Sequence, residues 1–493
     1  MSLMRYHGRG RQQTGLVPDR FLSEEACEAL LERVVSLCPS GWEVSLYIYS
    51  RWNGNLRWAR NEITTAGDIT EPRISITAQH RGRSGSFTIN RLDERSIERA
   101  IEAIKLRMAM LAPSDQPGRM RAAETYLETH LWSDATYNLD AAKRAELQQK
   151  LVAPAVAEGL LSAGYLSVSA IGNGVVNTSG LFAYLPETRA EYSVTVRNAT
   201  GTGSGWAGVS NKDWREIDPE RLLAIAIDKC KRSANPVAIE PGRYTVILEP
   251  QAVADLMMPL IYSLDRQTAE MGMGPWADRP EEAARAALIV GDTSAFESAQ
   301  GMGGEGGGGG TGNSKIGQLV LDPRITISAD PSDPEAPFVP FAGDGSPIRA
   351  VKWIENGVLR ELSYWRHYAV QRLNKPDPLI NSYSFRMSGG NTSIEQMIAQ
   401  TERGLLVTRL TNVRVVDRNS LLCTGTTSDG LWLIERGRIT KAVKNFRFRE
   451  SPIFAFNSLE ALGEPVRVLA YPPVIVPPAL VHDFSMTSLA DAV

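Results

Sequence analysis

A short apolar strand that runs directly into an apolar helix lies near the middle of this sequence. Residues Tyr244–Leu248 have the aromatic and β-branched character of a buried strand. Pro250 stands at the first position of the following helix, where proline is tolerated because the N–H that it lacks has no helical partner. Apolar residues then recur at helical spacing, which predicts one buried stripe that requires a large hydrophobic core. The stripe consists of Val253, Leu256, Met257, Leu260, Ile261 and Leu264.

The composition excludes several classes of protein. The chain has 493 residues, of which 43% are hydrophobic and 22% charged, so global disorder is excluded. A chain of this length suggests about two to four domains. Lys and Arg number 53, Asp and Glu number 56, and the net charge is −3. The protein therefore has no bulk electrostatic field that would attract nucleic acid or an anionic membrane.

The sequence predicts neither membrane insertion nor secretion. The longest apolar candidate, residues 151–176, is interrupted by Glu158 and by glycines that include Gly159, Gly164 and Gly172. Residues 1–15 are polar and Arg-rich, with no apolar segment of a secretory signal behind them. The four cysteines are scattered and contain no C-x-x-C pair, which argues against a disulfide framework or a cysteine zinc cage. We therefore expect a cytoplasmic protein with reduced thiols and with no membrane or nucleic-acid partner.

The order of helix-like and strand-like segments predicts an α+β protein of three domains. We expect a small N-terminal α/β domain at residues 1–115, a middle α+β domain at 116–238 and a β-rich C-terminal domain at 239–493. Within the last domain, residues 301–312 are expected to form a mobile Gly-rich loop. The predicted local elements are helices at 23–37, 93–110, 139–163 and 219–233, a hairpin turn at Asn53-Gly54-Asn55, a Gly-rich turn at 201–208 and a capping box at Thr392–Glu395.

Familiar catalytic motifs are missing from this sequence. The glycine run lacks a lysine directly after its last glycine, so it is not a phosphate-binding loop. No two of the five histidines lie three or four residues apart, so no single helix turn can hold a pair of histidine zinc ligands. His367 lies in an aromatic segment, where it is either a packing edge or part of a contact surface for a ligand. A peptidase site assembled around His367, Asp344 and Cys423 is one alternative, although a buried thiol is the simpler interpretation of Cys423.

A series of short motifs resembles the TldD/PmbA family. The similarity extends over residues 25–485, and the shared order of the motifs makes it specific. The motifs are Leu56–Asn61, Gly82–Gly85, Ser179–Gly180, Pro241–Pro250, Lys315–Gly317, Ile325–Ile327, Gly343–Gly345, Ile354–Leu359, Gly404–Leu406, Thr424–Gly425, Ile434–Gly437 and Ile439. The resemblance implies a TldD/PmbA-type fold and a cytoplasmic zinc peptidase system. Members of this family form dimers, often of two related chains, that enclose a groove for an unfolded peptide.

The resemblance also implies where zinc would bind in a catalytic member. There, a helix after the Val-Ile-Leu strand carries His-Glu-x-x-x-His, whose histidines bind zinc and whose glutamate is the base for attack by metal-bound water. A downstream cysteine completes the metal shell. In this chain the corresponding positions are Met258, Pro259 and Ser263, and no cysteine follows Cys423. We therefore expect no metal, no cofactor and no catalytic residue in this chain.

The family resemblance thus implies a PmbA-like, non-catalytic subunit of a proteolytic complex. We expect it to bind unfolded peptide by strand addition, with Met258, Ser263, His367 and Arg386 as candidate peptide-binding residues. Its partner would be a second copy of the chain or a zinc-bearing TldD-like chain, and zinc would be confined to that catalytic partner. Two alternatives stay open: a peptidase with a non-standard site, and a homodimeric peptide-binding or scaffold protein without a peptidase partner.

Overall fold

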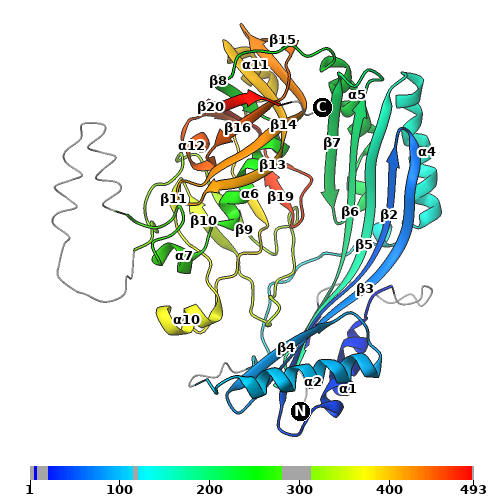
Figure 1. The fold of residues 1–493 in the computed structure, drawn as a ribbon, viewed down its shortest axis with the longest axis vertical. Coiled ribbons are helices and arrows are strands. Elements are labelled where there is room, and N and C mark those ends of the chain that lie inside the picture. Colours follow the sequence, from blue (N-terminus) through cyan, green and yellow to red (C-terminus); the bar gives the residue numbers. More distant parts are fainter. Residues whose placement is uncertain (1–4, 8–19, 115–119, 280–312, 491–493) are drawn as a thin grey trace, which may run out of the picture.

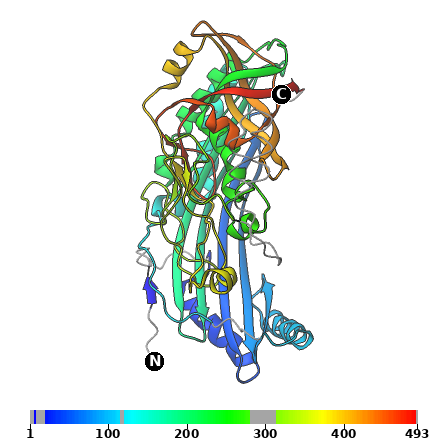
Figure 2. The same cartoon turned by 90° about the vertical axis from the view of Figure 1, so that its left-hand side faces the viewer.

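One long, curved antiparallel sheet runs through the first half of the molecule (Figures 1 and 2). The computed structural model describes residues 5–7, 20–114, 120–279 and 313–490. The strand order of this sheet is β1-β6-β5-β2-β3-β4, with β7 paired to β6, and only β1 is parallel to its neighbour. Its strands are β1 (Arg5–His7), β2 (Glu43–Ala59), β3 (Glu62–His80), β4 (Arg83–Ile89), β5 (Leu161–Asn177), β6 (Phe182–Arg197) and β7 (Ser204–Asn211).

The long sheet has two chemically different faces because its side chains alternate. On β2, Leu46, Ile48, Trp52, Leu56 and Trp58 are buried on one face, which we call the back. Helices cover this back face at both ends of the sheet. They are α1 (Glu24–Leu37), α2 (Glu94–Met110), α3 (Asp134–Tyr137), α4 (Ala141–Ala157) and α5 (Pro219–Arg232), and a short 3-10 turn, η1 (Trp214–Glu216), follows β7.

The C-terminal half contains two further sheets. In the larger one, β13, β8, β20, β16 and β14 pair in a ring that closes through β13 and β14. Its strands are β8 (Gly242–Leu248), β13 (Arg403–Asp417), β14 (Leu422–Glu435), β15 (Arg438–Ala442), β16 (Phe446–Glu450), β17 (Leu459–Leu462) and β20 (Ala479–Leu489). The smaller sheet contains β9 (Ile327–Ala329), β10 (Val351–Glu355), β11 (Val358–Leu359), β12 (Phe385–Met387), β18 (Val466–Arg467) and β19 (Val474–Val476).

Helix α6 (Pro250–Tyr262) lies in the core of this half, between the two sheets (Figure 1). The apolar stripe predicted from the sequence is confirmed, because all six of its residues are at most 1% exposed. Shorter helices surround this core: α7 (Arg266–Glu270), α10 (Arg366–Leu373), α11 (Ile394–Gln400) and α12 (Pro452–Asn457). The α+β fold class predicted from the sequence is thereby confirmed.

The predicted hairpin turn at Asn53-Gly54-Asn55 is wrong. β2 continues to Ala59, and the turn falls at Arg60 and Asn61, whose φ angles are 52° and 67°. Gly54 instead accommodates a buried side chain, because a Cβ there would lie 2.4 Å from Nη1 of Arg144. That guanidinium forms an ion pair with Asp68 and donates a hydrogen bond to the carbonyl of Leu139 at 2.8 Å. Gly54 therefore makes room for the Arg144 side chain within the sheet and does not form a turn.

Three other local predictions need smaller corrections. The helix predicted at 139–163 ends at Ala157, because Gly159 adopts a left-handed φ of 67° and β5 begins soon after it. Most of the predicted turn at 201–208 is strand β7. The capping box begins at Ser393 rather than Thr392, with Gln396 as its second member. The predicted loop at 301–312 lies outside the described residues.

Strands from both sides of residue 115 belong to one sheet. β2 and β5 pair over most of their length, so the N-terminal and middle segments predicted from the sequence share a continuous hydrogen-bonded ladder. None of the helices in the described part of the chain is both long and apolar enough to cross a bilayer.

Gly205 provides a test of how closely α5 packs on the sheet. A Cβ at this position would lie 2.2 Å from the carbonyl oxygen of Ala226. We expect Gly205→Ala to lower the free energy of unfolding by about 1–3 kcal/mol, because helix and strand would have to separate. Gly67→Ala is the control, since nothing lies within 4 Å of its Cβ position. Denaturant unfolding measures both; equal stability of the two variants would contradict the packing.

Candidate functional site

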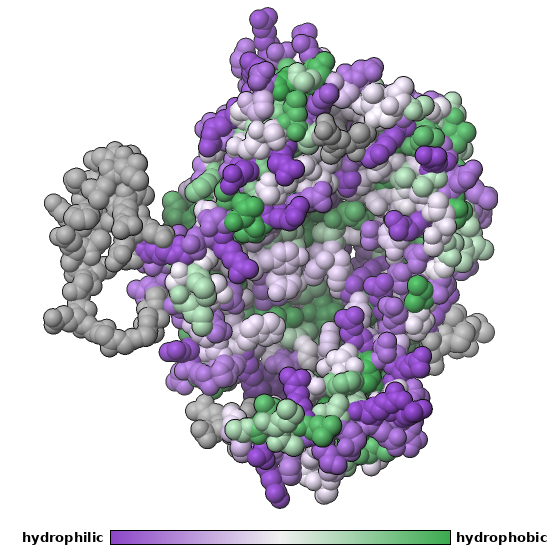
Figure 3. Space-filling view, in the orientation of Figure 1, coloured by the Kyte–Doolittle hydropathy of each residue, from purple (hydrophilic) through white to green (hydrophobic). Residues whose placement is uncertain are grey.

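The polar face of the long sheet is hollowed where it meets the C-terminal half. One hollow of about 280 Å³ lies between strands β5 to β7 and the segment 466–473. A second hollow of about 950 Å³ lies over β2, β3 and the end of β4. Arg51 lines both, so we treat them as one continuous feature, the front groove. Figure 3 shows the molecule hollowed near its centre, between the C-terminal elements and the long sheet.

Register places a row of polar side chains across the floor of this groove. Asn53 of β2 lies opposite Ser169 of β5, which in turn lies opposite Arg189 of β6. Residues directly opposite one another in an antiparallel sheet share a face, so these three side chains lie together. Ser167 and Ser169 both donate to Oδ1 of Asn53, at 2.8 and 2.9 Å. The floor is therefore rigid and polar, and hydroxyl and amide groups predominate in it.

Arg189, which is paired with Glu187 on the same strand, joins the floor to the C-terminal half. Arg189 donates from Nε to Glu187 at 2.7 Å and from Nη2 at 3.0 Å. Asn173 donates to the same carboxylate at 3.2 Å. The guanidinium also donates to the hydroxyl of Tyr471 and lies 3.2 Å from the centre of its ring. This cation–π contact fixes the segment 466–473 against the sheet.

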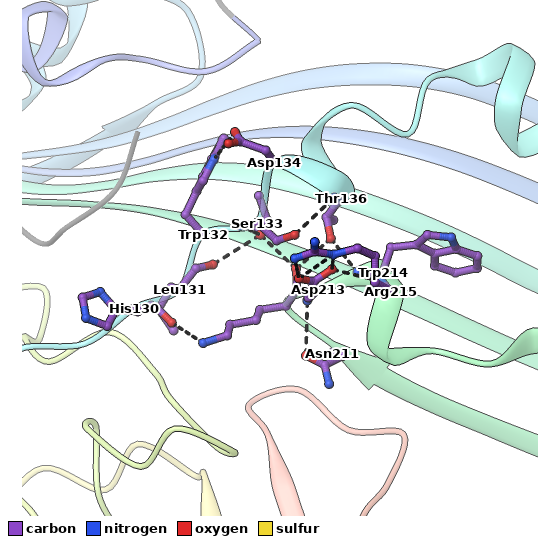
Figure 4. Close-up of polar contacts among 12 residues, drawn as sticks. His130, Leu131, Trp132, Ser133, Asp134, Thr136, Asn211, Asp213, Trp214 and Arg215 are labelled. Carbon is purple, nitrogen blue, oxygen red and sulfur yellow. Dashed lines mark hydrogen bonds and ion pairs between the residues drawn. The ribbon is translucent and has the colours of Figure 1, made fainter. Parts of the chain in front are cut away.

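The wall of the smaller hollow comes from two segments that are tied together, residues 130–136 and 211–215 (Figure 4). The Thr136 hydroxyl donates to the carbonyl of Lys212 and accepts from the N–H of Trp214, both at 2.8 Å. Hydrogen bonds from Arg215 hold the pKa of the Asp213 carboxyl below its usual range. This latch positions Lys212, whose ammonium donates to the carbonyl of His130 at 2.6 Å.

Helix α6 is linked to the same segment. Its incompletely buried residues lie at helical spacing and form one stripe: Gln251, Asp255, Met258, Pro259 and Tyr262. The amide of Gln251 accepts from the N–H of Leu469 at 3.0 Å. Since Leu469 precedes two residues that line the smaller hollow, Ala470 and Tyr471, this contact connects the α6 stripe to the front groove.

The positions that would hold zinc do not fit a zinc ion. Met258 offers a thioether and Pro259 offers no donor atom, whereas zinc sites in proteins use thiolate, imidazole and carboxylate ligands. The Ser263 hydroxyl already donates to the carbonyl of Leu260 at 2.7 Å and accepts from the Trp276 indole at 2.9 Å. Across the ranges that the structure describes, no three His, Cys, Asp or Glu side chains are grouped as a metal site would require. These side chains therefore support no step of a metal mechanism.

Asp255 is the one carboxyl side chain on the α6 stripe. It accepts from Gln251 at 2.9 Å and from the backbone N–H of Leu410 at 3.0 Å. Burial raises the pKa of its carboxyl to about 6, although these hydrogen bonds and the nearby Arg409 oppose the shift. The carboxyl links α6 to β13 through its hydrogen bond from Leu410.

The structure does not gather the four candidate peptide-binding residues into one site. Met258 is partly buried on the α6 stripe, and Ser263 caps the end of the same helix. His367 is exposed on α10. Arg386 on β12 forms ion pairs with Asp333 and Glu335 at 2.8 and 2.6 Å. Their roles in binding stay predictions.

The alternative catalytic trio is also not assembled. Asp344 accepts from the N–H and the hydroxyl of Ser346, at 2.9 and 2.8 Å. Cys423 is fully buried in the core around α6, and burial raises the pKa of its thiol to about 11. Within the described chain, no hydrogen bond or ion pair joins either residue to His367. This arrangement does not supply an activated nucleophile.

The front groove was not found from the sequence. Its central contact, between Arg189 and Tyr471, joins residues 282 positions apart. The available signal was the alternation of polar and apolar residues along residues 43–59 and 161–197, which identifies a polar face but not what lies opposite it.

Two family models match the sequence. Residues 44–107 match the PmbA/TldA metallopeptidase domain 1, and residues 308–488 match the PmbA/TldA metallopeptidase C-terminal domain. The first range covers β2 to α2, and the second covers most of the ring of strands. No curated protein matches the sequence.

Solved structures share the fold over nearly the whole chain. TldE from Thermococcus kodakarensis is 17% identical with a TM-score of 0.72, covering 94% of this chain and 99% of that one. A proposed modulator of DNA gyrase from Thermotoga maritima is 17% identical with a TM-score of 0.74, covering 94% and 100%. A similar protein from Bacteroides thetaiotaomicron is 16% identical with a TM-score of 0.73, covering 95% and 100%. At these identities the likeness shows the fold alone.

The raised pKa of Asp255 predicts a measurable pH dependence of stability. The unfolded chain releases this proton near pH 3.8 but the folded protein only near 6, so the carboxyl costs stability as the pH rises between these values. We expect Asp255→Asn to gain on the order of 3 kcal/mol relative to the native chain as the pH rises through that range, measured by denaturant unfolding.

Asp417→Asn is the contrasting variant. A hydrogen bond from Ser420 lowers the pKa of the Asp417 carboxyl, so its removal should act in the opposite direction. If the free energy of unfolding of the native chain and of Asp255→Asn changed with pH in the same way, the raised pKa of the buried Asp255 carboxyl would be contradicted.

Proposed function

Because the chain belongs to the PmbA/TldD metallopeptidase family, we propose that it is a metal-free subunit of a peptide-processing complex that binds unfolded peptide in the front groove. The observation that carries this proposal is the α6 stripe. Where a catalytic member would present zinc ligands, this chain has Met258, Pro259 and a Ser263 hydroxyl that is already hydrogen-bonded.

The dimensions and chemistry of the front groove support an extended peptide as its occupant. The groove is made of two open hollows that adjoin at Arg51, and its floor offers amide and hydroxyl groups rather than one deep apolar cavity. Two strands border the smaller hollow, β7 and β18, and in the described residues each pairs with a strand on one side only. An extended chain could pair with such an edge through backbone hydrogen bonds, which are independent of sequence.

We further propose a cytoplasmic complex with a second subunit that supplies the zinc chemistry. The partner would be a zinc-bearing TldD-like chain, or a second copy of this chain if binding alone is its role. In either case this chain would hold and orient the peptide, and hydrolysis would belong to the assembly.

Arg51 tests the groove as the binding site. It is the one residue common to both hollows, and its guanidinium can donate to peptide carbonyls at their junction. With an amidated, unfolded peptide that carries no acidic side chain, we expect Arg51→Glu to weaken binding about tenfold, because donors are replaced by a carboxylate. Fluorescence titration of a dansyl-labelled peptide measures the affinity.

Arg57→Glu is the matched control. It makes the same charge change on the same strand and face, but at an exposed position outside both hollows. Equal weakening by the two variants, or no effect of Arg51→Glu, would place the peptide elsewhere.

A reconstitution experiment tests the division of labour. We expect the purified chain alone to hold no stoichiometric zinc and to cleave no unfolded peptide. After co-expression with a zinc-bearing family member, we expect a copurifying complex with peptidase activity that a chelator abolishes. Tightly bound zinc in the isolated chain, or chelator-sensitive cleavage by it, would refute the proposal.

A further inference from the structure

Besides Arg51 and the paired Arg189, two cations line the smaller hollow of the front groove, and neither is paired with a carboxylate. Lys212, which follows β7, donates to the carbonyl of His130. Arg467 of β18 donates from Nε to the carbonyl of Ser210 at 2.5 Å and from Nη1 to the carbonyl of Glu335. Through the described chain, these backbone oxygens are their only hydrogen-bond acceptors, and no ion pair involves either residue. Most of their N–H donors therefore remain available.

The environment of the two cations disfavours their charge. Burial, followed by the charge of Arg467, lowers the pKa of the Lys212 ammonium. Burial lowers the pKa of Arg467 to about 10, even though Asp333 and Glu335 are close enough to oppose that change. Two like charges that are partly buried and repel each other become more stable when an anion binds between them.

The nearby carboxylates are committed to other partners. Asp213 is bound by Arg215 at 2.6 Å, and Asp333 and Glu335 are both bound by Arg386. Within the hollow, Glu187 is paired with Arg189.

The remaining carboxyl of the hollow, Glu191, does not neutralise these cations either. Burial alone raises its pKa, and neither Lys212 nor Arg467 contributes to that shift. The positive end of the hollow is therefore not compensated from within.

We propose that Lys212 and Arg467 form a carboxylate-binding subsite at one end of the front groove. This inference rests on the proposed peptide-binding function and specifies which peptides bind best. The carboxylate is either the C-terminal group of the peptide or an Asp or Glu side chain. The latch of residues 130–136 against 211–215 holds Lys212 in place (Figure 4). The contact of Tyr471 with Arg189 holds the segment that carries Arg467.

Peptide affinity measured with the full chain tests the subsite. The probes are dansyl-labelled unfolded peptides of glycine, serine and alanine: a free acid, its C-terminal amide, the amide with one internal glutamate, and the amide with glutamine instead. We expect at least one carboxylate-bearing peptide to bind about tenfold or more tightly than its neutral counterpart, as charge-assisted hydrogen bonds do. Preference for the free acid identifies the C-terminal group, and preference for glutamate over glutamine identifies the side chain.

Variants then assign the effect to the two cations. We expect the double variant Lys212→Met/Arg467→Met to lose the preference for carboxylate-bearing peptides while binding the neutral amides normally. The charge-conserving variants Lys212→Arg and Arg467→Lys should retain most of that preference. Arg57→Met is the control, because Arg57 is exposed on β2 and lies outside both hollows. Since the comparison of acid with amide in the native chain needs no variant, misfolding of the double variant cannot mask the result.

The outcomes separate the subsite from the proposed function. Binding of all four peptides with equal affinity would overturn the subsite and leave the peptide groove intact. A preference that persists in a folded double variant would also overturn it. Failure of every peptide to bind would overturn both proposals.

Discussion

Alternation along the strands of the long sheet determines how the rest of the molecule is arranged. The strands place apolar side chains on the back, where α1, α2, α4 and α5 cover them. The front is polar around Asn53, Ser169 and Arg189 and apolar around Val175 and Leu185. A polar face cannot be sealed by an apolar core without leaving its groups unpaired. The C-terminal half packs Phe341 against the apolar part of the front. It meets the polar part through specific contacts, chiefly those between Arg189 and Tyr471, and a groove remains there.

The same separation of faces operates in helix α6. Its apolar stripe is buried in the C-terminal core, while Gln251, Asp255 and Met258 lie on the less buried side. This is the side on which the family resemblance expects metal chemistry, and in this chain it carries an amide, a buried carboxyl and a thioether. These side chains suit contact and packing, so the proposed function is tested at the groove rather than at the helix.

Local sequence signals predicted most individual elements. The capped helices beginning after Ser23 and Asp93 and the apolar stripe of α6 are in place, because caps and periodicity act within a few residues. The turn predicted at Gly54 failed because a residue 90 positions later, Arg144, occupies the space beside it. The front groove escaped prediction for a related reason: its walls come from strands and loops that are distant in the chain.

The sequence by itself determined the family, the α+β class, the two-faced strands and the absence of His, Glu and His at positions 258, 259 and 263, since these depend on residue type and short-range spacing. Only the tertiary structure decided which polar groups are paired and which are not. Lys212 and Arg467 are unremarkable in the sequence, yet folding brings them to the same hollow and commits the neighbouring carboxylates to Arg215 and Arg386. Charge compensation depends on distance and burial, and neither quantity is defined until the chain has folded.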